Sequence, residues 1–405
     1  MRDADAGDRP HPRFVVWELT LACDQRCAHC GSRAAEARPD ELSTAEALDV
    51  VRQLAALGTR ELALIGGEAY LHPGFLDVVA AARAAGMSPT MTTGRRGVTD
   101  ERARALAAAG IEHVSVSIDG LAATHDLIRA TRGSFDSALA ALGHLGAAGV
   151  RVACNSVVNR LNVDELEPLY EILRAAGIRG WQVQLMAALG RAADRPDLLL
   201  QPWQLLELVP RIARLKARAF GDGILLSPGN NVGYFSHDEK LLRSLAPDGD
   251  AHWQGCQAGR YVMGIESDGA VKGCPSLPTR PYVGGHVRAE SLRKIWENAP
   301  ALAFTRRRTV DDLWGFCRSC PFAAVCLGGC NFTAHSLLGR AGNNPYCHYR
   351  VKTLAADGVR ERLVPRERAP GEPFDHGRFD LVREPFDAPD PPPPRREDRL
   401  RVWRG

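Results

Sequence analysis

Short β-rich segments alternate with longer amphipathic segments from residue 14 to about residue 190. The β-rich segments are residues 14–19, 61–68, 88–93, 113–119, 151–158 and 180–185. Between them lie helical patterns such as TAEALDVVRQLAALG, which ends in glycine, a common residue at helix ends. Strands that alternate with helices form parallel βαβ units. Six such units predict an α/β fold, a partial (β/α)6 TIM-like barrel, whose functional side chains lie at the carboxyl ends of the strands.

The composition changes along the chain and predicts five regions. Residues 1–13 form an N-terminal extension, residues 14–200 the barrel, and residues 201–250 a helical connector that includes one short strand, GILLSP. Residues 251–355 are rich in Cys and Gly with few long periodic runs, so we expect a small domain that relies on bound metal. Residues 356–405 are rich in Pro and Arg, which predicts an extended or flexible tail.

Charge and hydropathy exclude several classes of protein. The net charge of +3 gives no sign of a nucleic-acid-binding surface. The N-terminal MRDADAGDRPHPR lacks the apolar core of a signal peptide, and no apolar run approaches the length of a membrane span. We therefore expect a cytoplasmic protein. Its eleven cysteines are then more typical of metal sites than of disulfides, because that compartment keeps thiols reduced.

Three cysteines follow the first predicted strand in the segment ELTLACDQRCAHCGSR. Cys23, Cys27 and Cys30 have the spacing C-x3-C-x2-C, and thiolates select zinc or iron–sulfur clusters. A complete site usually has four protein ligands. Three cysteines on one loop can instead hold three irons of a [4Fe–4S] cube and leave the fourth iron open. The triad alone also allows zinc, with His29 or a distant residue as the fourth ligand.

Polar residues and glycines end the neighbouring strands. The second strand ends in GGEAY, where Gly66 and Gly67 permit close approach to the backbone and Glu68 can accept hydrogen bonds from an ammonium group. The fourth ends in SVSIDG, where Ser117 and Asp119 suit hydroxyl groups such as those of a ribose. The IDG segment by itself is equally typical of a turn.

Two further segments add partners for a ligand. Arg129 in HDLIRATRGSF can pair with a carboxylate, although a solvated helix charge has the same pattern. Asn155 and Ser156 on the fifth strand can reach the same ligand or simply satisfy backbone groups. Together, the strand ends offer partners for an amine, a carboxylate and a sugar.

Seven cysteines lie late in the chain: Cys256, Cys274, Cys317, Cys320, Cys326, Cys330 and Cys347. Four of them form the block CRSCPFAAVCLGGC, with spacing C-x2-C-x5-C-x3-C, which is a strong signal for a closed metal site. Spacing alone leaves a zinc knuckle open. Cys154 stands apart in the fifth strand, where packing is favoured over a role as hydrogen donor.

The triad, the GGE segment and the SIDG segment together resemble the radical S-adenosylmethionine (SAM) superfamily, over residues 14 to about 190. The resemblance implies that the triad holds a cluster whose open iron chelates the amino and carboxylate groups of SAM. It implies contacts from Gly66, Gly67 and Glu68 to the methionine amine. It implies further SAM contacts from Ser117, Asp119, Arg129 and Asn155. Ala69 and His29 depart from the usual proline and aromatic residue, but neither change removes a ligand.

The late cysteines resemble the SPASM domain, a C-terminal iron–sulfur extension of some radical SAM enzymes. This resemblance implies two auxiliary [4Fe–4S] clusters. The outer cluster would be held by Cys317, Cys320, Cys326 and Cys347, and the inner one by Cys256, Cys274 and Cys330. The stretch CQAGRYVMG lacks the eighth cysteine of some members. The inner cluster would then have an open iron or a noncysteine ligand, or be labile or absent.

The resemblance implies an oxidoreductase that reductively cleaves SAM to a 5′-deoxyadenosyl radical, which abstracts hydrogen from a substrate. SPASM-bearing enzymes largely modify peptides or proteins, so we expect a peptide maturase of ribosomally made peptides (RiPPs) that forms a crosslink or oxidises a side chain. The barrel begins near residue 14, so we expect a separate leader-binding protein, or recognition by the SPASM surface. The electron donor would be an external flavodoxin or ferredoxin.

Two alternatives remain at this point. One is an enzyme of cofactor biosynthesis that alters a tetrapyrrole or builds a peptide-derived cofactor. The other is a noncatalytic protein with zinc sites or electron-carrying clusters, which predicts no cleavage of SAM.

Overall fold

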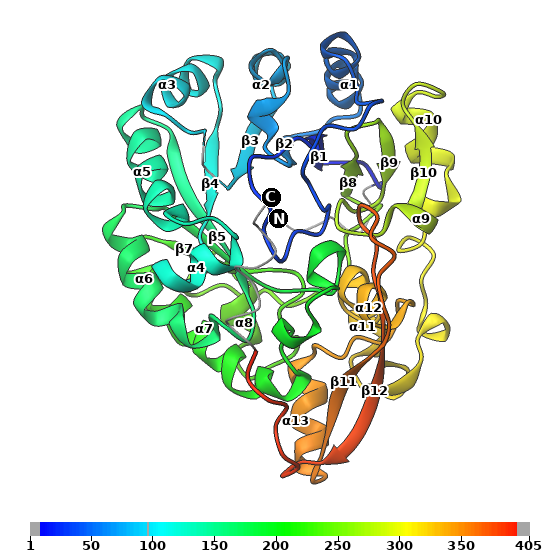
Figure 1. The fold of residues 1–405 in the computed structure, drawn as a ribbon. Helices are drawn as coiled ribbons and strands as arrows, with labels where there is room; N and C mark the ends of the chain where they lie inside the picture. The colour runs from blue at the N-terminus through cyan, green and yellow to red at the C-terminus, as the bar shows by residue number, and fades with distance from the viewer. Residues whose placement is uncertain (1–8, 95–96, 395–405) are drawn as a thin grey trace.

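The alternating pattern folds into a single large sheet in the computed structural model, which describes residues 9–94 and 97–394. The sheet has ten strands in the order β10-β9-β8-β1-β2-β3-β4-β5-β6-β7. Its parallel barrel strands are β1 (Phe14–Thr20), β2 (Glu61–Gly66), β3 (Ser88–Thr93), β4 (His113–Ser117), β5 (Arg151–Val158), β6 (Gly180–Leu185) and β7 (Leu225–Pro228). The predicted partial barrel is confirmed, and its strands curve around a central space (Figure 1).

Helices pack on the outside of these strands (Figure 1). They are α1 (Thr44–Ala56), α2 (Phe75–Ala84), α3 (Asp100–Ala109), α4 (Ala122–Ile128), α5 (Ser134–Ala147), α6 (Leu166–Ala175) and α7 (Leu205–Gly221). Ser43 and Glu46 form a capping box that begins α1, and Gly110 in a left-handed conformation ends α3. The main core lies between the outward side chains of the strands, such as Val15 and Trp17, and the apolar faces of the helices.

Strand β7 lies in the predicted connector and coincides with the short strand predicted for GILLSP. It pairs in parallel with β6, so the barrel sheet continues beyond residue 200. Helix α8 (Glu239–Arg243) then leads toward the Cys-rich region.

The Cys-rich region shares the barrel's sheet. Strand β8 (Val262–Ile265) pairs in parallel with β1, and the sheet continues antiparallel through β9 (Ala270–Lys272) and β10 (Val283–His286). The helices of this region are α9 (Thr279–Tyr282), α10 (Leu292–Asn298), α11 (Ala323–Cys326), α12 (Asn331–Leu338) and α13 (His348–Ala356). The two regions are therefore joined by backbone hydrogen bonds along the whole of β8.

Short 3₁₀ helices complete the chain. They span Ala69–Leu71, Val163–Glu165, Gly190–Ala192, Pro196–Leu198, Pro202–Gln204, Pro300–Leu302, Val310–Asp312 and Gly315–Ser319. Within the described ranges, no helix combines the length and the apolar character needed to cross a membrane.

The C-terminal segment corrects our prediction of a flexible tail. Strands β11 (Val359–Glu367) and β12 (Arg378–Pro385) form an antiparallel hairpin, and only residues 395–405 of the predicted tail lie outside the described residues. The charged residues that suggested a solvated tail are paired instead. Arg350 donates to Glu361 through Nε and Nη2 at 2.6 and 2.8 Å, with both side chains buried. Arg360 lies over the Trp203 ring and pairs with Glu384.

Replacing Glu361 with Gln should destabilise the protein, because it leaves the Arg350 charge buried without its counterion. We expect the free energy of unfolding to fall by about 3–5 kcal/mol. Thermal unfolding of the anaerobic protein would measure this as a lower Tm. The matched control is Arg366→Met in the same hairpin, whose ion pairs are about half exposed, with a cost of roughly 0.5 kcal/mol or less. Equal Tm values for the two variants would contradict the assignment.

Candidate active site

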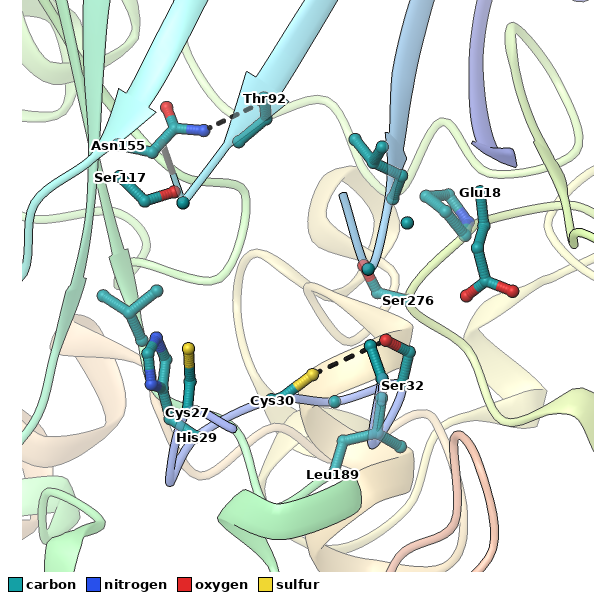
Figure 2. A pocket seen from close by; sticks show the side chains of 18 of the residues that line it. Glu18, Cys27, His29, Cys30, Ser32, Thr92, Ser117, Asn155, Leu189 and Ser276 are labelled. Carbon is teal, nitrogen blue, oxygen red and sulfur yellow. Dashed lines mark hydrogen bonds between the residues drawn. The ribbon is translucent and has the colours of Figure 1, made fainter. Parts of the chain in front are cut away.

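The loop that follows β1 carries the cysteine triad at the carboxyl edge of the sheet. It is held against the end of β2 by two backbone hydrogen bonds, from Gly67 N to Thr20 O at 2.7 Å and from Glu68 N to Ala22 O at 2.8 Å. All three cysteines line a cavity of about 480 Å³ inside the barrel. Figure 2 shows Ser117 and Asn155 on one side of this cavity and Glu18 and Ser276 on the other, with Cys30 between them.

The two glycines at the end of β2 are required by this packing. A Cβ on Gly66 would lie 2.2 Å from Thr20 O, and one on Gly67 would lie 2.0 Å from Ala22 O. Gly66 also has a φ of +147°, which side chains disfavour. Both glycines line the cavity, as expected for ligand contacts. Their first physical role, however, is to let the triad's own loop approach the strand.

Glu68 lines the cavity and is held by hydrogen bonds to both carboxylate oxygens. Thr93 Oγ1 donates to Oε2 at 2.6 Å, and Gly94 N donates to Oε1 at 2.7 Å. Burial raises the pKa of Glu68 to about 7, since the ionised form is desolvated. A cation in the cavity would favour ionisation. The predicted contact between Glu68 and an ammonium group therefore fits this environment and stays a prediction.

The resemblance implies SAM contacts from both Asp119 and Arg129, but the structure places the two residues differently. Arg129 lines the cavity and lies 3.7 Å from Cys27 Sγ through Nη1, whereas its Nη2 pairs with Asp119 Oδ2 at 2.6 Å. Asp119 is fully buried behind it and also accepts a hydrogen bond from Val157 N. Burial opposes ionisation of Asp119, but Arg129 and His29 lower its pKa overall. Asp119 is thus placed to hold Arg129 rather than to contact a ribose.

His29, the zinc ligand of the alternative interpretation, is engaged in the same cluster. Its Nε2 lies 3.3 Å from Asp119 Oδ2. Burial lowers the pKa of His29 to about 4, so the ring is neutral near pH 7 and this contact is not an ion pair at that pH.

Asn155 and Ser156, which we considered together as ligand partners, point to opposite faces of strand β5. Asn155 lines the cavity, donating to Thr92 Oγ1 at 3.5 Å and accepting from Ser115 Oγ at 3.0 Å. Ser156 points the other way and accepts from Trp181 Nε1 at 2.9 Å. Cys154 shares that buried face, which agrees with the predicted packing role, and burial raises its pKa to about 12. The two-residue period of a strand explains the division.

The electrostatic effects that the late cysteines exert on one another follow the two sets that the resemblance implies, and their ligand roles stay predictions. Burial, with the proximity of Cys256 as a further cause, raises the pKa values of Cys274 and Cys330 to about 11 and 12. Burial also raises the pKa of Cys326, with added effects from Cys347 and from the remaining members of its set, Cys317 and Cys320. Within the described ranges, no three His, Cys, Asp or Glu come close enough to hold a single metal ion. Thiolates of a cubane cluster bind different irons and therefore stand farther apart.

Aromatic side chains surround the four-cysteine set. Tyr234 and Trp253 pack with Cys326, Cys330 and Cys347 in one buried cluster. The Tyr234 hydroxyl accepts a hydrogen bond from Cys330 N at 2.9 Å, so it contacts the residue that belongs to the other set. This aromatic shell covers Cys326, Cys330 and Cys347, whereas Cys317 and Cys320 are partly exposed.

These residues fit an iron–sulfur cluster and SAM. Three thiols on one loop face a cavity that also contains a buried carboxyl group and a buried guanidinium group. Arg129 Nε has no hydrogen-bond partner in the part of the chain that the structure describes, and a carboxylate ligand would satisfy it.

Comparisons with known proteins agree with this geometry. Residues 17–173 match the model of the radical SAM superfamily, and residues 256–321 match that of the SPASM iron–sulfur cluster-binding domain. The chain is 30% identical over 349 residues to the AdoMet-dependent heme synthase of Methanosarcina barkeri, covering 84% of this chain and 97% of that protein. The chain belongs to the radical SAM superfamily. As a radical SAM enzyme it uses SAM and [4Fe–4S] clusters.

Two further similarities bear on this radical SAM enzyme. It is 31% identical over 391 residues to the mycofactocin maturase MftC of Mycobacterium tuberculosis, covering 92% of this chain and 90% of that protein. Its fold resembles that of Streptococcus suis SuiB bound to the precursor peptide SuiA, with a TM-score of 0.64 and 15% identity, covering 84% of this chain and 75% of that one. The SPASM match ends at residue 321, so the ligand roles of Cys326, Cys330 and Cys347 stay predictions.

Glu18 is a cavity residue that our sequence analysis missed. Its Oε1 accepts from Ser267 Oγ at 3.2 Å and lies 3.4 Å from Arg38 Nη2. Its Oε2 is buried and has no hydrogen-bond partner within the described ranges. Burial raises the pKa of Glu18 to about 8, although Arg38 partly opposes this. A single glutamate in the otherwise apolar strand FVVWELT was the signal that could have identified it.

The cavity wall contains other residues that we missed. Leu189, Phe332 and Phe374 line it together with Pro275 and Ser276. They come from four separate segments, and only Pro275 and Ser276 lie beside a predicted cluster ligand, Cys274.

Replacing Gly67 with Ala should displace the triad loop, because the new Cβ meets backbone atoms that cannot rotate away. We expect the reconstituted protein to lose up to one cluster, roughly four irons, and the associated electron paramagnetic resonance (EPR) signal. Iron and sulfide analysis would measure the loss. Gly143→Ala in α5 is the matched control, since nothing lies within 4 Å of its Cβ position. Full iron content in Gly67→Ala would contradict the proposed constraint.

Proposed function

We propose that this radical SAM enzyme oxidises a side chain of a ribosomally made peptide or protein. The observation that carries the proposal is the size and position of the cavity. Its volume of about 480 Å³ must hold SAM and the reacting part of the substrate. Sites for a single small ligand already occupy about 300–1,000 Å³. The space left beside SAM suits one side chain of a polymer better than a whole macrocycle.

The position of the cavity supports an oxidative reaction. It extends from the triad to Pro275 and Ser276, which follow Cys274, and to Phe332, which lies two residues beyond Cys330. A substrate atom in this end would therefore lie between the triad and the predicted inner set. The similarity to a mycofactocin maturase supports a peptide substrate, and SuiB provides a related fold solved with its precursor peptide.

The bound cofactors supply an electron, a 5′-deoxyadenosyl radical that takes a hydrogen atom from the substrate, and an auxiliary electron acceptor. The protein's residues orient and protect these groups. Glu68 and Arg129 offer an acceptor for the SAM ammonium and a donor for its carboxylate, each held in place by buried partners. A substrate that loses a hydrogen atom and then an electron must also lose a proton. Glu18 Oε2 faces the cavity without a partner among the described residues and can accept that proton.

Partners complete the proposal. A separate protein would present the leader of the peptide, or the SPASM surface itself would bind it. A flavodoxin or a ferredoxin would reduce the cluster of the triad.

The test is anaerobic reconstitution with synthetic peptides taken from the short reading frames that flank the gene. We expect about twelve irons per chain, 5′-deoxyadenosine on addition of SAM and dithionite, and a peptide that has lost a pair of hydrogens by mass spectrometry. Cys27→Ala should lose 5′-deoxyadenosine and product, whereas Cys317→Ala should keep some cleavage and lose product. Cys154→Ala is the matched control and should keep both. Bound zinc, or clusters without cleavage of SAM, would overturn the enzymatic function.

A second candidate is an enzyme that alters a tetrapyrrole. The similarity to heme synthase over nearly the whole length of that protein favours it. Conversion of an iron tetrapyrrole by the reconstituted enzyme, with the peptide left unchanged, would select this candidate over the first.

Replacing Glu18 with Gln should uncouple SAM cleavage from product formation, because the proton acceptor is removed. We expect the ratio of product to 5′-deoxyadenosine to fall by about 10²-fold or more, with cleavage retained. In the wild type this ratio should rise with pH through the Glu18 pKa of about 8, since only the ionised carboxylate accepts a proton. The ratio in Glu18→Gln should not change over that range.

The control is Glu297→Gln, an exposed glutamate on α10, which should behave as the wild type. A wild-type ratio and pH profile in Glu18→Gln would exclude this role.

A further inference from the structure

The turn between β11 and β12 reaches back to the loop that carries the triad. Phe374 N donates to Gly31 O at 3.2 Å, directly after Cys30 in the sequence. Asp375 Oδ1 accepts from Arg33 Nε at 2.8 Å, and Gly190 N donates to Asp375 O at 2.8 Å. Figure 1 shows this connection running from the hairpin past α12 toward the barrel. The far end of the chain is thus tied to the loop of the active site.

The ion pair between Arg33 and Asp375 is held by further contacts on both residues. Asp375 is buried, and its Oδ2 accepts from Glu372 N at 3.0 Å. Arg33 also pairs with Asp194 Oδ2 at 2.6 Å, so its guanidinium joins the turn to the segment after β6. The triad loop and the segment after β6 therefore both hold the turn in place.

Phe374 lines the cavity beside Leu189 and Phe332 and is 7% exposed. Lys272 Nζ lies 4.0 Å from the centroid of its ring, a cation–π contact with a fully buried ammonium group. The backbone φ of Phe374 is +55°, an unusual value for a residue other than glycine. Such conformations persist where the surroundings determine them, and they cluster at functional sites.

We propose that Phe374 forms the wall of the reaction chamber beside the triad loop, where it excludes water and packs against the reacting group of the substrate. Leu189 and Phe332 also line the cavity, so an aliphatic or aromatic substrate group fits this wall. A substrate radical is exposed to side reactions wherever water has access, and an apolar wall prevents this. The inference rests on the radical SAM chemistry and does not depend on whether the substrate is a peptide.

A purely structural role makes a different prediction. If Phe374 only fastens the hairpin, its truncation lowers the Tm and leaves the solvent around the cluster unchanged. If it closes the chamber, truncation admits water to the cavity near the triad.

The test uses the reconstituted full-length enzyme with SAM in D₂O and no substrate. The reduced cluster of the triad is identified by the change in its EPR signal when SAM is added. Pulsed EPR of that signal then detects exchangeable deuterium near the cluster. We expect Phe374→Ala to deepen the deuterium modulation at least twofold over the wild type. The matched control is Phe386→Ala, an exposed phenylalanine just after β12, which should leave the modulation unchanged.

Equal modulation in Phe374→Ala and Phe386→Ala would overturn the proposal. If Phe374→Ala does not load its clusters, the same measurement is made on Phe374→Leu. This variant removes the aromatic ring but keeps most of the packing. An increase in Phe374→Leu supports the proposal, and a wild-type value overturns it. Because no substrate is present, failure here is distinguishable from failure of the peptide assignment.

Discussion

Strand β1 lies between strands from distant parts of the sequence, and the rest of the site depends on this pairing. It pairs with β2 on one side and with β8 on the other, all in parallel. The carboxyl ends of these strands therefore meet at one edge of the sheet. The triad follows β1, the glycines end β2, and the chain returns from β8 through β9 to Cys274. One cavity is consequently bounded by both cysteine-bearing regions.

Buried charges in this cavity are held by partners that are themselves buried. Arg129 is paired with Asp119, and Glu18 lies against Arg38, which also contacts Glu266. Isolated charges would be costly to bury, whereas paired charges keep a fixed position and a defined protonation state. The site therefore presents its polar groups already oriented, which lowers the reorganisation required when ligands bind.

Local patterns predicted the strands and the triad well, because period-two hydropathy and close cysteine spacing are properties of neighbouring residues. These local patterns were less informative about the direction in which each side chain points. Asp119 ends a strand as expected, but it is turned toward Arg129, and Ser156 faces the core while Asn155 faces the cavity. The C-terminal segment was misinterpreted because its arginines resemble solvated charges. Arg360 is instead buried over Trp203, a partner more than a hundred residues away in the sequence.

The sequence by itself determined the parallel barrel and the grouping of ten cysteines into an early triad and a late set, since each follows from spacing and residue chemistry along the chain. Only the tertiary structure brought Glu18 and Phe374 to the wall of the cavity. Glu18 meets Ser267 across 249 positions, and Phe374 meets Gly31 from a hairpin near the other end of the chain. Contacts of this range arise when separate segments pack together, and they leave no periodic pattern in the sequence around either residue.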